Sequence, residues 1–207
     1  MPQPAQLSSR NKDFETLRRT FPNLHDFFDA VADTTYPAIT DLPLLDAIVR
    51  VVNSQMLSTK AASAIFSRIE AAAKQRRLKY LANLTADELR GCGMSQGKVR
   101  SIHEFRTKYR KEPSRFEKWR TLPFTELEKE VDTIWGISTW TAEMLAMFYF
   151  GHKDVFPSKD LAINRGVELT RRYVDAEFDP EQGSPCRTLL ARCIWRSFEV
   201  DFWGSFE

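Results

Sequence analysis

The sequence predicts an all-α protein, and three observations support this fold class. Apolar residues recur at helical spacing along most of the 207-residue chain. The alternation of apolar and polar residues that half-buried strands require is scarce, and Val155-Phe156 is too short to indicate a sheet. Helix-start sequences and regularly placed prolines divide the chain into about ten short helices; these prolines are Pro22, Pro37, Pro43, Pro113, Pro123, Pro157, Pro180 and Pro185.

The first strong helical patterns fall between residues 44 and 69. One apolar helical face comprises Leu44, Leu45, Ile48, Val49 and Val52. A second face, with Ser58 or Thr59 as its candidate N-cap, comprises Ala61, Ala62, Ile65, Phe66 and Ile69. Residues 1–10 are polar and contain proline, and we expect them to be disordered.

Helical patterns continue through the second half of the chain. Thr85–Glu88 and Thr125–Glu128 both match a capping box, in which side chains satisfy the first N–H groups of a helix. After Ser95, an apolar face comprises Val99, Ile102 and Phe105. A short helix leading into Gly136 is predicted from Leu127, Val131 and Ile134, and the next helix from Trp140, Met144, Met147 and Phe148.

The composition fits one globular domain or two small lobes and gives no overall signal for a polyanionic partner. Hydrophobic residues make up 43% of the chain, charged residues make up 28%, and the formal net charge is only +2. Any surface that binds nucleic acid must therefore be local. The strongest basic excess lies in residues 96–120, which hold nine Lys or Arg against three Glu. A solvated charged surface is the alternative interpretation of this run.

The cysteines and the N-terminal sequence point to an intracellular protein. Cys92, Cys186 and Cys193 lack zinc-finger or iron–sulfur spacing. The N-terminal residues have no apolar signal-peptide core, and no apolar run approaches the roughly 18 residues of a membrane span. We therefore expect a soluble protein with buried or free thiols and no membrane association.

A tight turn between two helices is predicted at W-G-I-S-T-W-T-A-E-M, residues 135–144. Gly136 can adopt backbone angles closed to other residues, and Thr139 is a candidate cap for a helix that begins at Trp140. The N–H groups at such a helix start lack intrahelical partners and can bind a phosphate oxygen without reading sequence. The alternative is an ordinary helical corner.

The segment D-V-F-P-S-K-D-L-A-I-N-R-G, residues 154–166, places one carboxylate at the start of another helix. The positive end of the helix dipole stabilises the negative charge of Asp160. Alone, this pattern is typical of an ordinary helix-start acid. Together with a phosphate-binding turn some twenty residues earlier, it indicates chemistry on DNA.

Five segments in register resemble the helix-hairpin-helix (HhH-GPD) DNA glycosylase superfamily. The turn resembles the family's G-[I/V]-G-x-x-T-A, and residues 155–166 resemble V-F-P-x-x-D-L-x-[L/I]-x-[R/K]-G. The others are V-V-N-S-Q-M-L-S-T-K-A-A, L-R-G-C-G-M-S-Q-G-K-V-R-S-I and S-P-C-R-T-L-L-A-R-C-I-W-R. The 3-methyladenine DNA glycosylase II group is the most similar. Ser138 replaces the second hairpin glycine, and Lys159 stands where an acid or small residue is usual.

The resemblance implies a two-lobed helical fold with a cleft between the lobes. One lobe would combine residues 11–44 and 159–207, and the other would span residues 45–158 and contain the helix-hairpin-helix at about 127–150. The implied function is a monofunctional DNA glycosylase of base excision repair, acting as a monomer on double-stranded DNA that contains damaged bases. It would flip and hydrolytically excise alkylated bases of the 3-methyladenine or 7-methylguanine type, in the cytoplasm and nucleoid or in a nucleus.

Asp160 is the catalytic residue that the resemblance implies. A fixed carboxylate stabilises positive charge on the sugar and can orient or deprotonate the attacking water. Trp140 stands where bifunctional members carry a Schiff-base lysine, so no lyase activity is expected. Trp140, Trp135 and Tyr36 are candidates for an aromatic pocket that holds a cationic base by stacking. The alternative for each is a place in the core.

Further residues are candidates for contacts with DNA. Met56 could fill the gap left by a flipped base, and Gln55 could contact the opposite base. The candidate contacts to the DNA backbone are Gly136, Ser138, Thr141, Lys98 and Lys159. No cofactor is required, although the carbonyls of Ile134 and Gly136 could hold a structural Na⁺ or K⁺.

Three alternatives remain at this stage. The same scaffold could bind damaged DNA without catalysis. It could also be a glycosylase for uracil, deaminated or mismatched bases, although the mismatch branch is not favoured without iron–sulfur cysteines. A protein-interaction domain is the third alternative, and it predicts no salt-dependent affinity for DNA.

Overall fold

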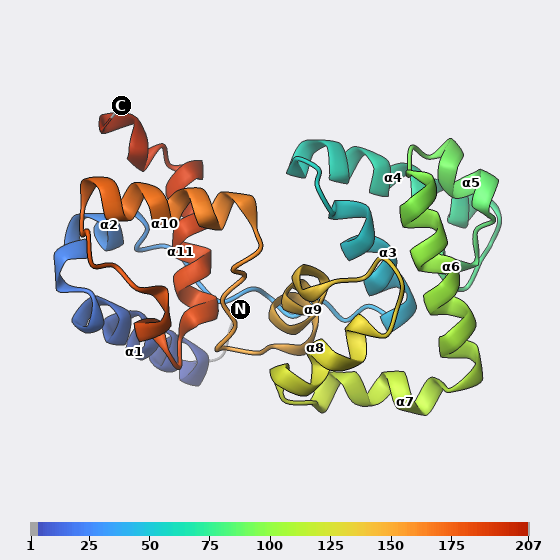
Figure 1. The fold of residues 1–207 in the computed structure, drawn as a ribbon, viewed down its shortest axis with the longest axis horizontal. Coiled ribbons are helices and arrows are strands. Elements are labelled where there is room, and N and C mark those ends of the chain that lie inside the picture. Colours follow the sequence, from blue (N-terminus) through green and yellow to red (C-terminus); the bar gives the residue numbers. More distant parts are fainter. Residues whose placement is uncertain (1–3, 207) are drawn as a thin grey trace. The chain divides into compact units, whose positions relative to one another are not determined.

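The computed structural model describes residues 4–206 and consists of helices joined by loops (Figure 1). The all-α prediction is confirmed, since no strand occurs within this part of the chain. Contacts between Cα atoms divide the chain into two compact units, Met1–Ala38 with Gly151–Glu207, and Ile39–Phe150. These boundaries fall a few residues before those expected at 44/45 and 158/159, and the assignment of functional lobes stays a prediction. None of the described helices is both long and apolar enough to cross a membrane.

The N-terminal stretch expected to be disordered is only partly described. Residues 1–3 lie outside the described part of the chain, while the backbone from Pro4 onward forms the first turns of α1 (Pro4–Thr20). Proline is tolerated in a first helical turn because the N–H group that it lacks has no intrahelical acceptor there. The following A-Q-L sequence also favours a helix. The disorder expected for residues 1–10 stays a prediction.

The first unit is built around α11 (Arg187–Glu199), which packs against α10 (Leu161–Tyr173), α1 and α2 (His25–Ala30). Gly166 allows the close approach of α10 to α11, because a Cβ atom there would lie 2.3 Å from Cγ2 of Ile194. Aromatic and aliphatic side chains fill this core, among them Leu17, Phe27, Phe28, Leu190 and Ile194. The packing fixes the N-terminus of α10, where Asp160 lies, against the side of α11.

The second unit contains seven α-helices and one π-helical turn among its described residues (Figure 1). They are α3 (Leu44–Ser54), α4 (Thr59–Gln75), α5 (Ala86–Gly91), α6 (Gln96–Lys111), α7 (Pro113–Glu117), α8 (Phe124–Asp132), α9 (Thr139–Leu145) and η4 (Ala146–Phe150). Helices α8 and α9 form a hairpin, and α9 packs on α3, which also contacts α4 and α6. Most residues of the predicted apolar faces are buried, including every member of the 44–52 face.

The predicted helix starts are confirmed in two cases and wrong in a third. Ser58 caps α4 by accepting a hydrogen bond from the Ala61 N–H, and Thr85 with Glu88 forms the expected capping box. Thr125 caps nothing, because α8 already begins at Phe124, directly after Pro123. Proline favours the extended backbone that precedes a helix, so it starts this one before Thr125.

Candidate functional site

The Asp160 carboxylate lies at the N-terminus of α10 and is held there by the helix itself. Its Oδ1 atom accepts hydrogen bonds from the N–H groups of Ala162 (3.0 Å) and Ile163 (3.1 Å). Asp160 is thus the N-cap of α10, as the sequence predicts, and its side chain lies at the positive end of the helix dipole. The side chain is half-buried.

A third donor to Asp160 comes from α11 and was not predicted from the sequence. The indole N–H of Trp195 lies 3.2 Å from Oδ1 of Asp160, so one carboxylate oxygen accepts three hydrogen bonds. Donors from two helices fix both the position and the rotation of the carboxyl group. The only sequence signal for Trp195 was its place in the C-terminal segment C-I-W-R.

The tight turn between α8 and α9 depends on Gly136. Its φ angle is +73°, and a Cβ atom there would lie 2.2 Å from the hydroxyl oxygen of Ser101 on α6. Both the backbone conformation and the close packing therefore require glycine. The expected capping residue is wrong by one position: Ser138 is the N-cap and Thr139 is the first residue of α9. The Ser138 side chain makes no capping bond, and the residue is exposed.

The carbonyl groups expected to hold a cation each accept a hydrogen bond within the second unit. The Ile134 oxygen accepts the N–H of Ile137 (3.2 Å), and the Gly136 oxygen accepts a hydrogen bond from the side-chain amide of Gln55 (3.3 Å). A carbonyl oxygen has two lone pairs, so each retains capacity for one further contact. Oxygen atoms of this kind suit a hard monovalent cation.

The indole ring of Trp135 lies beside the turn and is partly exposed. Its side chain is 43% exposed, and the Arg100 guanidinium lies 3.9 Å from the ring centroid. The backbone N–H of Trp135 donates to Glu104 (3.2 Å), and Lys108 bridges the same glutamate and the Thr133 carbonyl. These contacts lock the start of the turn to α6. Trp140, in the first turn of α9, is half-buried.

Tyr36 lies in the first unit, with its hydroxyl group buried. The Lys153 ammonium lies 5.1 Å from the centroid of its ring, and the hydroxyl group is close to Cys186 and Asp13. Burial and these acidic neighbours raise the pKa of Tyr36 above its ordinary value. A role for the ring in a base pocket stays a prediction.

The candidate wedge residue projects from the loop between α3 and α4. Met56 is 86% exposed, which excludes the alternative that it is a core residue. Its φ angle is +55°, in the left-handed region that residues with a Cβ atom rarely adopt. The neighbouring Leu57 is 38% exposed, so the loop tip presents apolar surface to solvent. Such a tip is costly unless it meets a partner.

Three expected DNA contacts have intramolecular partners instead. Thr141 is fully buried and accepts a hydrogen bond from the Gln55 amide (3.0 Å), so its side chain cannot reach a phosphate. The predicted contact of Thr141 is therefore wrong. Gln55 directs its amide toward the hairpin, and the Lys98 ammonium donates to the carbonyls of Asn53 (2.8 Å) and Gln55 (2.7 Å). Gly136, Ser138 and Lys159 are exposed.

Much of the basic run at 96–120 serves to hold the second unit together. Its members donate to carbonyl oxygens or pair with carboxylates: Arg106 with Ala82, Arg110 with Asn83, Arg115 with Glu130, and Arg120 with Leu42 and Glu117. Side chains held in this way have a structural role in the second unit, whereas their positive charge is cancelled only where the partner is a carboxylate, as for Arg115 and Arg120.

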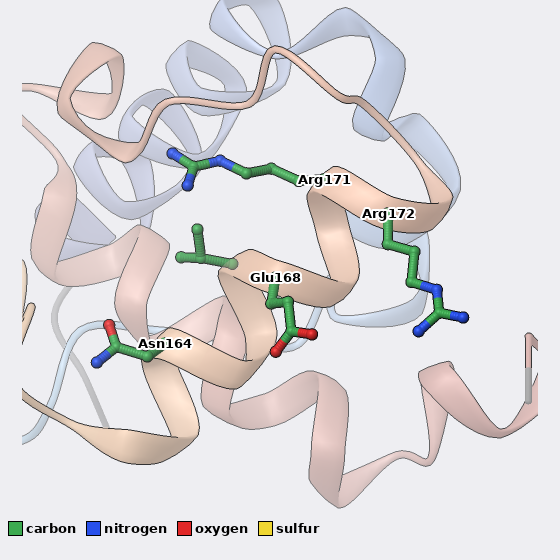
Figure 2. A pocket seen from close by; sticks show the side chains of 5 residues that line it. Asn164, Glu168, Arg171 and Arg172 are labelled. Atoms are coloured by element: carbon green, nitrogen blue, oxygen red, sulfur yellow. The ribbon is translucent and has the colours of Figure 1, made fainter.

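A surface hollow lies along α10 (Figure 2). It is lined by Asn164, Val167, Glu168, Arg171 and Arg172, which share one face of a single helix. Arg171 also donates to the Phe178 carbonyl (2.8 Å), so part of its side chain stabilises the following loop. The hollow contains none of the predicted site residues, and we assign it no role in the chemistry.

Comparisons with known proteins agree with this arrangement. A family described as the HhH-GPD superfamily of base excision DNA repair proteins matches residues 49–179. DNA-3-methyladenine glycosylase 1 of Schizosaccharomyces pombe is 30% identical over 168 residues, which cover 75% of this chain and 72% of that protein.

Two solved structures share the fold. The S. pombe 3-methyladenine DNA glycosylase in complex with abasic DNA has a TM-score of 0.73 at 24% identity, covering 91% of this chain and 97% of its own. A DNA-3-methyladenine glycosidase from Bacillus halodurans has a TM-score of 0.66 at 24% identity, covering 92% and 91%.

Proposed function

The chain belongs to the HhH-GPD superfamily of base excision DNA repair proteins, and from this premise we propose that it is a monofunctional DNA glycosylase for alkylated bases. It would act as a monomer on double-stranded DNA, flip the damaged base and hydrolyse its N-glycosidic bond. The observation that carries the proposal is the Asp160 carboxylate, fixed by three donors at the start of α10. The similarity to a 3-methyladenine glycosylase supports alkylated purines as the substrate class.

Asp160 supplies the negative charge that the reaction requires. As the bond between C1′ and the base nitrogen breaks, its electron pair leaves with the base and positive charge develops on the sugar. A fixed carboxylate stabilises that charge and directs a water molecule to C1′, accepting the proton that the water loses. An alkylated purine already carries a positive charge, so it departs as a neutral base without a dedicated general acid.

The aromatic side chains are suited to a cationic base. Trp140, at the start of α9, is our candidate for the pocket wall, because an electron-rich ring attracts a methylated purine through its face. Trp135 and Tyr36 are weaker candidates, since Arg100 and Lys153 already lie over their rings. A tryptophan at 140 also provides no amine for a covalent intermediate.

The hairpin and the Met56 loop supply the proposed grip on DNA. The exposed residues Gly136 and Ser138 are our candidates for a phosphate contact at the start of α9, and the exposed Lys159 can add a charge-assisted contact. Met56 fills the space that the flipped base leaves in the duplex. A monovalent cation on the Ile134 and Gly136 carbonyls would add positive charge next to that phosphate, with no part in the reaction.

Duplexes that each contain one defined lesion test this function. We expect release of free 3-methyladenine or 7-methylguanine, measured chromatographically, with strand breaks only after alkaline treatment. Sodium borohydride should trap no protein–DNA adduct, including any with the exposed amine of Lys159. Release of uracil or mismatched adenine instead would assign a different specificity. Binding of abasic duplex without release of any base would identify a non-catalytic protein.

Removing the third donor to the catalytic carboxylate should slow excision while leaving DNA binding intact. We expect Trp195→Phe to lower the single-turnover rate about 10- to 100-fold, because a hydrogen bond to a charged group is lost while the ring volume is largely kept. The dissociation constant for abasic duplex should change less than about twofold, since no backbone contact is removed.

Trp203→Phe is the matched control for this change. Trp203 belongs to the same unit, is buried and donates its indole N–H to Ser197 (2.7 Å) on α11 instead of to Asp160. This variant should lower stability by a similar amount and excise at the wild-type rate. Equal losses of rate in both variants would show that Trp195 acts through folding alone.

A further inference from the structure

The loop that carries Met56 holds an unfavourable conformation. Residues 55–58 join α3 to α4, and Met56 has a φ of +55° with its side chain 86% exposed. A residue with a Cβ atom adopts this region at a steric cost, and an exposed thioether gains nothing from burial. The surrounding structure must therefore fix the loop.

Lys98 fixes the loop from one side. Its ammonium group donates to the carbonyl oxygens of Asn53 (2.8 Å) and Gln55 (2.7 Å), which belong to the end of α3 and to the residue before Met56. Carbonyls at a helix C-terminus lack intrahelical donors, so a lysine there satisfies them and complements the dipole. Two of its three N–H groups are thereby used within the protein.

The hairpin fixes the loop from the other side. The side-chain amide of Gln55 donates to Thr141 Oγ1 (3.0 Å) and to the Gly136 carbonyl (3.3 Å). The backbone of Gln55 thus accepts from α6 while its side chain donates to the α8–α9 turn. Met56 follows directly after the anchored residue Gln55 and precedes the exposed Leu57.

We propose that Lys98 is a positioning residue that presents Met56 to DNA in its inserting conformation before DNA binds. The inference rests on the proposed function. It assigns Lys98 to the preorganisation of the wedge, in place of the phosphate contact that its position in the sequence suggests. A loop that already has its bound conformation loses little conformational entropy when Met56 inserts. More of the free energy of the new contacts is then available for DNA affinity and for flipping the base.

The environment of Lys98 agrees with this role. Partial burial lowers the pKa of the ammonium group, which means that the side chain gives up hydration to make these contacts. Ser95 caps the first turn of α6 through the Lys98 N–H (3.4 Å), so the helix start from which the side chain extends is itself fixed. The lysine therefore links a rigid helix to the strained loop.

Lys98→Met and its matched control Arg106→Met provide the test. Arg106 also lies on α6 and donates to a carbonyl, that of Ala82 (2.8 Å), which belongs to neither the Met56 loop nor the hairpin. The probe is a duplex with 2-aminopurine next to an abasic-site analogue, whose fluorescence changes when a side chain inserts into the stack. We expect Lys98→Met to lose most of this change and to bind about tenfold more weakly, whereas Arg106→Met should retain both.

A double-mutant cycle with Met56→Ala separates positioning from phosphate contact. If Lys98 acts through Met56, then adding Lys98→Met to Met56→Ala should weaken binding less than about twofold further. A phosphate contact predicts that the two losses multiply and that the slope of log affinity against log salt falls by about one. That pair of results would overturn the proposal.

Lys98→Arg keeps the test decisive if the methionine variant folds poorly. A guanidinium group keeps the charge, but its N–H groups are fixed in the plane of a longer side chain and do not match the two carbonyl groups that one ammonium group meets. Positioning therefore predicts that Lys98→Arg also loses the insertion signal, whereas retention of the signal would contradict it. None of these measurements requires base release, so a wild-type protein that inserts but does not excise would refute only the glycosylase proposal.

Discussion

Asp160→Asn should fold normally, bind abasic duplex at near wild-type affinity and excise methylpurines about 10²- to 10⁴-fold more slowly. Asparagine is as good an N-cap as aspartate, and its side-chain oxygen can accept the same bonds from Ala162, Ile163 and Trp195. The variant loses only the negative charge and the ability to take a proton from water. Single-turnover release of 7-methylguanine from a duplex measures the excision rate, and thermal unfolding measures whether the variant folds normally.

Asp179→Asn is the control for this substitution. Asp179 caps the short helix Pro180–Gly183 in the same unit by accepting the Glu181 N–H (3.1 Å), and it is exposed. It resembles Asp160 as a helix-start acid but has no indole donor, so its amide variant should excise at the wild-type rate. If Asp160→Asn also retained full activity, another group would have to stabilise the charged sugar.

The parts of the molecule that local sequence determines were predictable. The helical spacing of apolar residues predicts the buried face of α3, and all five predicted members of this face are buried. Thr85 and Glu88 form a capping box because the four residues involved are consecutive. Asp160 caps α10 for the same reason, since its oxygen reaches N–H groups two and three residues later. Thr125–Glu128 matched the capping-box pattern equally well, but α8 begins at Phe124, directly after Pro123, so Thr125 is not its N-cap.

Contacts between distant segments were not predictable in the same way. Trp195 meets Asp160 across 35 residues only because Gly166 lets α10 and α11 approach closely. Lys98 lies in a segment that matched the family, but nothing in its spacing indicated that its ammonium group would turn to the end of α3. The burial of Thr141 depends likewise on the packing of α9 against α3. Such positions follow from tertiary packing, which overrides the local pattern.

Gly136→Ala should cause the largest loss of stability among single substitutions near the hairpin. The new Cβ atom would lie 2.2 Å from the Ser101 hydroxyl oxygen, and the residue would have to keep a φ of +73°. Overpacking and the left-handed conformation each cost of the order of 1–3 kcal/mol. We therefore expect about 2–4 kcal/mol of destabilisation in urea unfolding, together with weaker binding of undamaged duplex because the start of α9 is displaced.

Two further variants divide this loss into its causes. Ser101→Ala in the Gly136→Ala background removes the clashing oxygen and leaves the Ser101 Cβ atom at 3.4 Å, so it should recover the overpacking part and leave about 1 kcal/mol of backbone cost. Gly91→Ala is the control, since Gly91 is helical, has no positive φ and has nothing within 4 Å of an added Cβ atom. It should be neutral or stabilise by up to about 1 kcal/mol. If Gly136→Ala behaved like Gly91→Ala, the turn could not have the left-handed, tightly packed geometry on which the proposed phosphate contact depends.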